Sequence, residues 1–166
     1  MAVEVCSLKV ETNQLVPPNT WYLVRFPFDT ESTDPLDMHS DSRPPPGGPI
    51  LEWSTDERSS LIWPSRPGWG DLFALIQWEA AGAQSGCSDG TEYRDQFIRD
   101  PLGYTTTNPM DTTATHHRAA TIGGQYIEKS WGIFVNPDVP LALRVRHNCS
   151  DPLNLTLAEF KLAINF

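Results

Sequence analysis

The chain has 166 residues, a formal net charge of −9 and 12 lysine and arginine residues in total. A domain of this length buries about 70% of the surface that its unfolded form exposes, so its core does not depend on disulfide bonds. A sequence-independent nucleic-acid binder needs clustered basic residues, and those here are scattered. No stretch approaches the roughly 20 consecutive apolar residues of a membrane helix. We therefore expect neither nucleic acid nor membrane among its partners.

The N-terminal third combines short strand patterns with a long polar segment. Residues 1–19 contain one weak alternating run, VEVCSLKV, which predicts an N-terminal arm or an edge strand. Aromatic and β-branched residues predict a strand at 20–28, with a sheet edge or a bulge at its proline. Residues 29–49, with five acids and five prolines, predict a long loop, either an exposed recognition loop or a flexible insertion. Its run Pro44–Pro46 favours extended polyproline geometry.

The middle of the chain contains a strand that is apolar on both faces. A short strand is expected at 58–64, and DLFALIQWEA follows at 71–80. Leu72 and Trp78 belong to one face of the second segment, and Phe73 and Leu75 to the other. Such a strand must be covered on both faces. In a two-layer protein one face meets the core, so another subunit is a natural cover for the second face.

Four further strands are expected at 91–100, 112–122, 125–135 and 141–148, with loops at 81–90 and 101–111 among them. Ile127, Trp131, Ile133 and Val135 form the row of 125–135 that we expect to point inward. In LALRVRHN, at 141–148, Leu141, Leu143 and Val145 form the core row. Arg144 and Arg146 share the opposite row, where we expect them to face acidic neighbours on this subunit or on a partner.

The last segment, 153–166, changes its apolar face partway along. Leu153, Leu155 and Leu157 share one face. Phe160, Leu162, Ile164 and Phe166 share the other. Because side chains alternate strictly along a strand, either a β-bulge lies near Ala158 and Glu159, or the two halves bury opposite faces against different neighbours.

These patterns predict an all-β protein with little helix and about eight strands. Frequent turn residues between short aromatic and β-branched runs suit a two-sheet antiparallel jelly-roll sandwich. We expect a single jelly-roll domain at 20–166 that carries the 29–49 loop, preceded by the arm or edge strand at 1–19.

No segment has the spacing of a catalytic or metal-binding motif. His116 and His117 are adjacent, so on a strand they point to opposite faces and make a poor pair of metal ligands. Neither a glycine-rich phosphate loop nor the GxSxG motif of serine hydrolases occurs. We therefore predict that the protein is not an enzyme and that it has no catalytic residue, metal or cofactor.

The remaining polar signals have structural interpretations. His147 lies in the apolar row of its strand, which predicts a hydrogen-bonded histidine in the core or in an interface. Cys6, Cys87 and Cys149 have no CxxC spacing. The sequence leaves open a Cys6–Cys149 or a Cys87–Cys149 bond, and the simplest interpretation is buried thiols.

The C-terminal half resembles the trimeric jelly-roll domains of the C1q and tumour necrosis factor type. The similarity lies in GDLFALIQWEA, in the strand that ends in FIRD, and in the segment from QYIEKSWGIFV through Leu141–His147 to Phe160-x-Leu162. It covers roughly residues 70–166, and less closely 20–64. The resemblance implies a homotrimer. The candidates for its interface or for the core are Leu72, Phe73, Leu75, Trp78, Phe134, Phe160, Leu162, Ile164 and Phe166.

Similar domains without a leader occur as trimeric decoration proteins on the capsids of tailed bacteriophages. The N-terminus has no basic segment followed by an apolar run, so we expect synthesis in the host cytoplasm without a signal peptide. The resemblance implies a structural virion protein that cements a phage head by binding the major capsid protein at the capsid surface. The candidates for partner contacts are Arg144, Arg146, Trp53, Trp63 and Trp69.

An alternative is a receptor- or carbohydrate-binding tip domain of a phage tail or fibre, with a host surface glycan as its partner. Sugar-binding modules on β-sandwiches often present tryptophans such as Trp53, Trp63 and Trp69. Tryptophans beside loops also pack over the ends of a sandwich core, so a purely structural role for these three residues remains the alternative to sugar binding.

Overall fold

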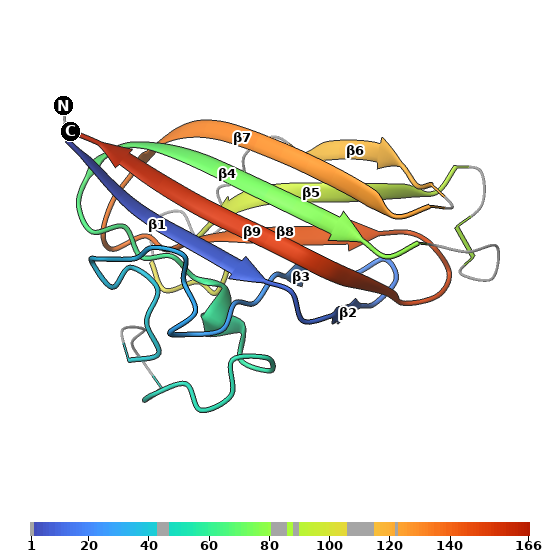
Figure 1. Cartoon of the computed structure of the whole chain (residues 1–166), viewed down its shortest axis with the longest axis horizontal. Helices are drawn as coiled ribbons and strands as arrows, with labels where there is room; N and C mark the ends of the chain where they lie inside the picture. The colour runs from blue at the N-terminus through green and yellow to red at the C-terminus, as the bar shows by residue number, and fades with distance from the viewer. Residues whose placement is uncertain (1, 43–46, 81–85, 88–89, 106–114, 122) are drawn as a thin grey trace.

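A computed structural model describes residues 2–42, 47–80, 86–87, 90–105, 115–121 and 123–166. Its strands form two antiparallel sheets that pack face to face (Figure 1), which confirms the predicted jelly-roll sandwich. The first sheet has the order β1-β9-β4-β7, with β2 paired to β9, and the second has the order β3-β8-β5-β6. The strands are β1 (Val3–Val10), β2 (Gln14–Val16), β3 (Tyr22–Leu23), β4 (Gly68–Trp78), β5 (Glu92–Arg99), β6 (His116–Ala119), β7 (Gln125–Val135), β8 (Leu141–His147) and β9 (Leu153–Asn165).

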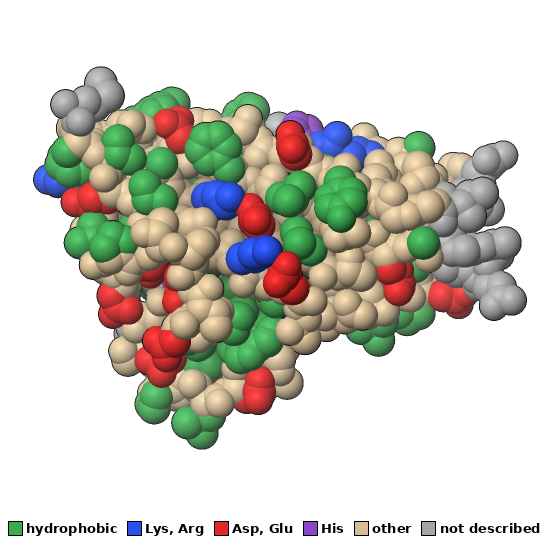
Figure 2. Space-filling view, viewed as in Figure 1, with side chains coloured by type: hydrophobic (Ala, Val, Ile, Leu, Met, Phe, Trp, Pro, Cys, Tyr) green, Lys and Arg blue, Asp and Glu red, His purple; other side chains and the backbone are tan. Residues whose placement is uncertain are grey.

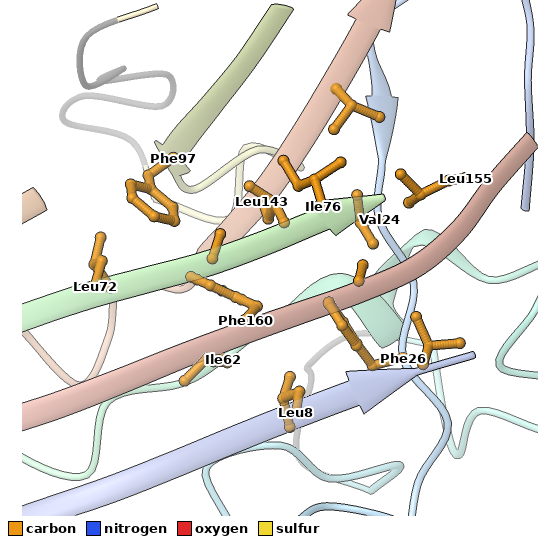
Figure 3. Packing of buried hydrophobic residues seen from close by; sticks show 14 of the residues in the cluster. Leu8, Val24, Phe26, Ile62, Leu72, Ile76, Phe97, Leu143, Leu155 and Phe160 are labelled. Carbon is orange, nitrogen blue, oxygen red and sulfur yellow. The ribbon is translucent and has the colours of Figure 1, made fainter. Parts of the chain in front are cut away.

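The main core lies between the two sheets (Figure 3). Phe160 of β9 is at its centre, with ring centroids 5.7 Å from Phe97 of the second sheet and 6.4 Å from Phe26. Nearer one end, Trp78 of the first sheet stacks on Tyr93 of the second at 4.9 Å. These aromatic pairs join the layers, because burying large rings against one another adds to the hydrophobic term that holds a sandwich together.

A β-bulge explains the change of face in 153–166. Gln77 of β4 pairs with Leu157, but the next residue, Trp78, pairs with Leu155, so β9 carries one extra residue at Thr156. The extra residue shifts the alternation by one position, and all apolar residues of β9 except Leu157 and Ala163 then point to the same core. The bulge is therefore the correct alternative, two residues before the predicted place.

Several sequence predictions need correction. Residues 57–60 form a short 3-10 helix in place of the strand expected at 58–64, since Asp56 caps it by accepting a hydrogen bond from the backbone N–H of Arg58. The strand expected at 20–28 shortens to the two residues of β3. Trp131 pairs with the buried Leu72 and lies on the same, inner face of the sheet, as expected. Its side chain is nevertheless 44% exposed, because β7 is the edge strand of its sheet.

Other predictions fall partly outside the described residues. The Pro44–Pro46 run lies there entirely, as do most of the 81–90 loop, residues 106–111 of the 101–111 loop, and residues 112–114 of the strand expected at 112–122. Within the described part of 112–122, β6 covers four residues.

A second, smaller apolar cluster covers one half of the second sheet's outer face. Ile98 of β5 and Ala142 of β8 point outward and are buried by Leu61 and Trp63. Ile62, between them, exchanges backbone hydrogen bonds of 2.9 Å with Leu141, which fixes this segment along the sheet. The outer row of β8 therefore begins under cover and becomes accessible only at its arginines.

The cysteines divide into a bonded pair and a free thiol. Cys87 and Cys149 form a disulfide across a sequence separation of 62 residues, so the interpretation of all three as thiols was wrong. Cys6 is free and buried, and its burial together with the nearby carboxylates of Asp34 and Glu31 raises the pKa of its thiol. The neutral thiol behaves as a small apolar core residue.

His147 is a fully buried histidine, as its place in the apolar row predicted. Its Nε2–H donates a hydrogen bond of 2.9 Å to the carbonyl of Val16, and its Nδ1 has no partner in the described part of the chain. Burial lowers the pKa of His147, and the hydrogen bond to Val16 opposes this only in part. The ring is therefore neutral in the folded protein and links β8 to β2.

We expect His147 to make the protein sensitive to mild acid. Because the folded-state pKa lies below the ordinary 6.5, the unfolded chain binds more protons as pH falls through that value. The free energy of unfolding should decrease between about pH 7.5 and 5.5. In His147→Gln, whose amide keeps a donor for Val16, urea unfolding should show a smaller decrease over this range. An equal decrease in both proteins would contradict the assignment.

Candidate interaction surfaces

The outer face of the first sheet carries four exposed aromatic side chains. Trp69 and Phe73 of β4 and Tyr126 and Phe134 of β7 are 52%, 46%, 64% and 53% exposed, and we call them the aromatic face. Trp69 and Phe134 are cross-strand partners, and Phe73 lies two rows further along, beyond the pair of Asp71 and Gly132. Exposed apolar patches of this kind commonly mark a contact with another protein.

Gly132 lets Trp69 lie flat on this face. A Cβ at position 132 would come within 2.7 Å of Cζ2 of the Trp69 ring, so only glycine leaves room for the indole. The ring therefore covers the backbone of the neighbouring strand. This broad, rigid apolar surface contains few rotatable groups, so ordering it in a contact costs little entropy.

Charged residues divide the face (Figure 2). Figure 2 shows hydrophobic side chains in two groups, separated by lysine, aspartate and glutamate side chains. Lys161 and Glu159 of β9 form an ion pair of 2.5 Å. With Phe73, Leu75 and Glu128 they border a hollow of about 520 Å³. The surface thus combines apolar rings with a shallow depression and charges of both signs.

The nine candidates for the core or a trimer interface divide into two groups in space. Those buried between the sheets are Leu72, Trp78, Phe160, Leu162 and Ile164. The others are Phe73, Leu75, Phe134 and Phe166, which are exposed or half-buried. Phe73, Leu75 and Phe134 lie together on the outer face of the first sheet, while the Arg66 guanidinium lies 3.7 Å from the Phe166 ring centre at its end.

The five candidates for partner contacts do not form one surface. Trp69 belongs to the aromatic face, whereas Trp63 is 7% exposed, packs beside Tyr104 and has no free surface for a partner. Trp53 is half-buried against the main core. Arg144 and Arg146 point outward from β8, on the opposite sheet. Trp53 and Trp63 thus have the core-capping position that was kept as the alternative to sugar binding.

The described part of the 29–49 loop is fixed to the sandwich by His39. This side chain is completely buried, and both of its ring nitrogens face acceptors. Nε2–H donates to the Ser59 carbonyl at 2.9 Å, and Nδ1 lies 2.7 Å from a carboxylate oxygen of Glu31. Phe28 stacks on the His39 ring at 4.5 Å, and Met38 beside it is buried in the core.

Glu31 is the carboxylate partner of this histidine. Burial by itself would raise the pKa of Glu31, but the hydrogen bonds from His39 and from backbone N–H groups lower it below its usual value. Asp34 holds the same turn, because its carboxylate accepts hydrogen bonds from the backbone N–H groups of Met38 and His39. The described loop is therefore a packed part of the domain, contrary to a flexible insertion.

A buried ion pair connects the two sheets at their other edge. Lys129 of β7 and Asp95 of β5 are both 1% exposed at their side chains, with Nζ 3.1 Å from Oδ1. Arg118 lies 3.4 Å from the same carboxylate, and Lys129 Nζ lies 3.1 Å from Nδ1 of His116. Burial lowers the pKa of Lys129, and Asp95 counteracts part of this. The cluster thus gathers Lys129 and Arg118 around one buried carboxylate and joins β5, β6 and β7.

The described residues do not contain a metal site. Among them no three histidine, cysteine, aspartate or glutamate side chains are grouped so that they could hold an ion. His116 points to the buried cluster and His117 points outward to Glu92 at 2.9 Å, as alternation predicted. No helix in the described part of the chain is long and apolar enough to cross a bilayer.

Sequence reasoning missed several residues of these surfaces. Tyr126 was not a candidate, although its alternation with Ile127 placed it on the outer face of β7. Lys129 was missed because a lysine within an apolar row was expected to be exposed to solvent, whereas its side chain is buried. His39 and Glu31 carry no local signal, because their pairing depends on how the loop folds back.

Comparisons with known proteins identify the fold. No family model and no curated protein match the sequence. Solved structures that match include the globular domain of zebrafish complement 1qA protein, with 7% identity, a TM-score of 0.57 and coverage of 97% of this chain and 95% of that one. Murine APRIL also matches, with 12% identity, a TM-score of 0.52 and coverage of 98% of this chain and 100% of that one. Eiger TNF from S. frugiperda matches with 12% identity, a TM-score of 0.52 and coverage of 100% of this chain and 94% of that one. The chain therefore has the C1q and tumour necrosis factor jelly-roll fold; likeness at this identity shows the fold alone.

We expect Glu31→Gln to weaken the attachment of the loop. The substitution keeps an acceptor for His39 but removes the carboxylate charge, so the free energy of unfolding at neutral pH should fall by about 1–2 kcal/mol. Glu11→Gln, which changes a carboxylate that is 69% exposed, serves as the matched control and should have little effect.

The pH dependence gives a second measurement on the same pair of proteins. Since the folded-state pKa of Glu31 is lowered, its contribution is present above about 4.5 and disappears as pH falls through the folded-state value. Urea unfolding at several pH values should therefore show the difference between wild type and Glu31→Gln shrinking in acid. A difference independent of pH would contradict the ion pair.

Proposed function

We propose that this protein is a non-catalytic structural module that assembles as a homotrimer through the aromatic face. The observation that carries the proposal is that Trp69, Phe73, Tyr126 and Phe134 are about half exposed on one sheet. Complete burial of a side chain of this size contributes roughly 1.5–3 kcal/mol, so covering four half-exposed rings supplies a substantial driving force. The C1q and tumour necrosis factor fold agrees with such an assembly.

The charges on this face are compatible with a subunit interface. Glu159 and Lys161 already form an ion pair, so their burial does not leave two isolated charges. Glu128 is exposed beside them and would remain near water at the rim. Interfaces commonly have an apolar centre and a polar rim. Here charged side chains lie between the two apolar groups, so an interface over the whole face would enclose the Glu159–Lys161 pair together with the rings.

Within this class we propose a decoration protein that cements the head of a tailed bacteriophage. The support comes from the sequence resemblance, the acidic composition and the apparent lack of catalytic motifs. A trimer that repeats modest contacts with the major capsid protein over a shell would gain avidity without a strong single site. The surface opposite the aromatic face, on the second sheet, would remain accessible in such a trimer.

The alternative, a receptor- or carbohydrate-binding tip domain, has less support from the geometry. It depended on three tryptophans and on the 29–49 loop as exposed contacts. Trp63 is buried, Trp53 packs against the core, and Trp69 shares the aromatic face with Phe134. The described part of the loop is held down by His39. A host glycan is therefore the second proposal for the partner.

We expect the protein to be a trimer in solution, with three times the mass of the 18.6 kDa chain. Phe73→Glu should convert it to monomers, because it removes an apolar ring and adds a second carboxylate beside the Glu159–Lys161 pair, and Lys161 alone cannot neutralise both carboxylates when they are buried. Light scattering coupled to size-exclusion chromatography measures the mass. Leu51→Glu, at a side chain that is 94% exposed on a loop, is the matched control and should remain trimeric. A monomeric wild type at micromolar concentration would refute the assembly.

The proposed location can be tested on purified particles. Antibodies raised against the chain should label the head surface of the phage that encodes it in electron micrographs. Label confined to the tail tip would support the alternative domain. Particles without any label, together with detection of the protein only outside virions, would overturn both phage roles while leaving the trimer intact.

A further inference from the structure

The open half of the second sheet's outer face carries a row of arginines. Arg144 and Arg146 point outward from β8, and Arg94 of β5 is the direct cross-strand partner of Arg146. The second apolar cluster covers the other half of this face around Ile98 and Ala142. We call Arg94, Arg144 and Arg146 the arginine strip. It is unusual on a chain whose formal net charge is −9.

Arg144 is held in one orientation. Its guanidinium lies 4.4 Å from the centre of the Trp21 ring, and its Nε–H donates a hydrogen bond of 2.6 Å to Gln96. Gln96 is itself buried, with 6% exposure. Burial lowers the pKa of Arg144, and no carboxylate in the described part of the chain counteracts this. The terminal N–H groups are therefore preorganised, and the described chain supplies them with no acid.

Arg94 and Arg146, the other two residues of the strip, have too few carboxylates around them to neutralise both guanidinium groups. Glu92 is shared, because it accepts from Nε of Arg94 at 2.6 Å and also pairs with His117 at 2.9 Å. The Arg146 side chain has no hydrogen bond or ion pair with any described residue. Like charges directly opposite on adjacent strands are destabilising. The strip therefore keeps a repulsive Arg94–Arg146 pair that an external anion would relieve.

The spacing indicates which anion fits. Alternate residues on one face of a strand lie about 7 Å apart, so this is the separation of the Arg144 and Arg146 positions along β8. Carboxylates at alternate positions of an extended peptide have the same separation. A guanidinium can bind a carboxylate through two parallel hydrogen bonds, which lysine cannot do.

We propose that the arginine strip binds an extended acidic peptide segment of a partner protein, with carboxylates at alternate positions paired to Arg144 and Arg146. A nucleic acid fits less well, because the rest of this acidic chain would repel its many phosphates. A sugar ring would need the open face of an aromatic ring, and Arg144 already covers one face of Trp21. The strip lies on the sheet opposite the aromatic face, so the proposal does not rest on the trimer.

The test uses a fluorescein-labelled peptide, Ser-Glu-Ser-Glu-Ser-Glu-Ser, and its glutamine counterpart, with fluorescence anisotropy at low and high salt. The glutamate peptide should bind, with an affinity that falls as salt rises, and the glutamine peptide should not. Arg146→Gln and Arg144→Gln should each weaken binding about tenfold, the loss expected for one charge-assisted contact. The Arg146 side chain makes no hydrogen bond or ion pair with a described residue, so its variant should fold normally, which thermal unfolding checks.

Arg66→Gln is the matched control. It removes the same charge from a side chain that is 43% exposed at the edge of the first sheet, and it should bind the peptide like wild type. Equal weakening by all three substitutions would show that peptide binding depends on net charge alone, and this result would overturn the proposal. So would absence of binding at low salt, or binding of heparin or an oligonucleotide in place of the peptide. Light scattering on the same variants separates this outcome from failure of the trimer.

Discussion

The register of β9 is the constraint on which the rest of the structure depends. This strand pairs with β1, β2 and β4, so its orientation sets which face of the whole first sheet meets the core. Without the extra residue at Thr156, Leu153 and Leu155 would point outward when Phe160 points inward. The bulge brings both halves of the apolar row to one core, and Phe160 then meets Phe97 across the sandwich.

With the register of β9 set in this way, the outer faces of the two sheets have different properties. On the first sheet, the outward residues of β4 and β7 include aromatic rings that the described chain leaves half exposed. On the second sheet, the segment around Trp63 buries one half and leaves the arginines on the other. Apolar and cationic surfaces are thereby separated by the thickness of the sandwich. A contact at one does not need to exclude a contact at the other.

Buried charges fix the elements that the apolar core does not. His39 and Glu31 hold the long loop, and Lys129 and Asp95 join β7 to β5. A buried ion pair is weak evidence for net stability, because the desolvation of both charges offsets their attraction. Its directional hydrogen bonds nevertheless disfavour other arrangements of the same segments. We infer that these pairs specify the position of the loop and the edge strand more than they add free energy.

The alternation of apolar and polar residues predicted the strands best where the side chains of both faces followed a clear pattern. Alternation in β4, β8 and β9 identified the core rows and the outward position of Arg144 and Arg146. It failed at 58–64, where Asp56 offers a cap for a short helix, and at Trp131, where strand order and not parity decides exposure. Neither the capping geometry nor an edge position can be read from a period of two.

The sequence by itself determined the class of fold, the absence of a recognisable catalytic motif, and a two-faced strand that calls for a second cover. Those features are local, since alternation and turn residues act over a few positions. Only the tertiary structure decided that Cys87 bonds Cys149, that His39 lies against Glu31, and that Arg94 faces Arg146. The disulfide and the arginine pair join segments that are distant in sequence and that strand pairing brings together. His39 and Glu31 belong to one loop, and their contact depends on how that loop folds back.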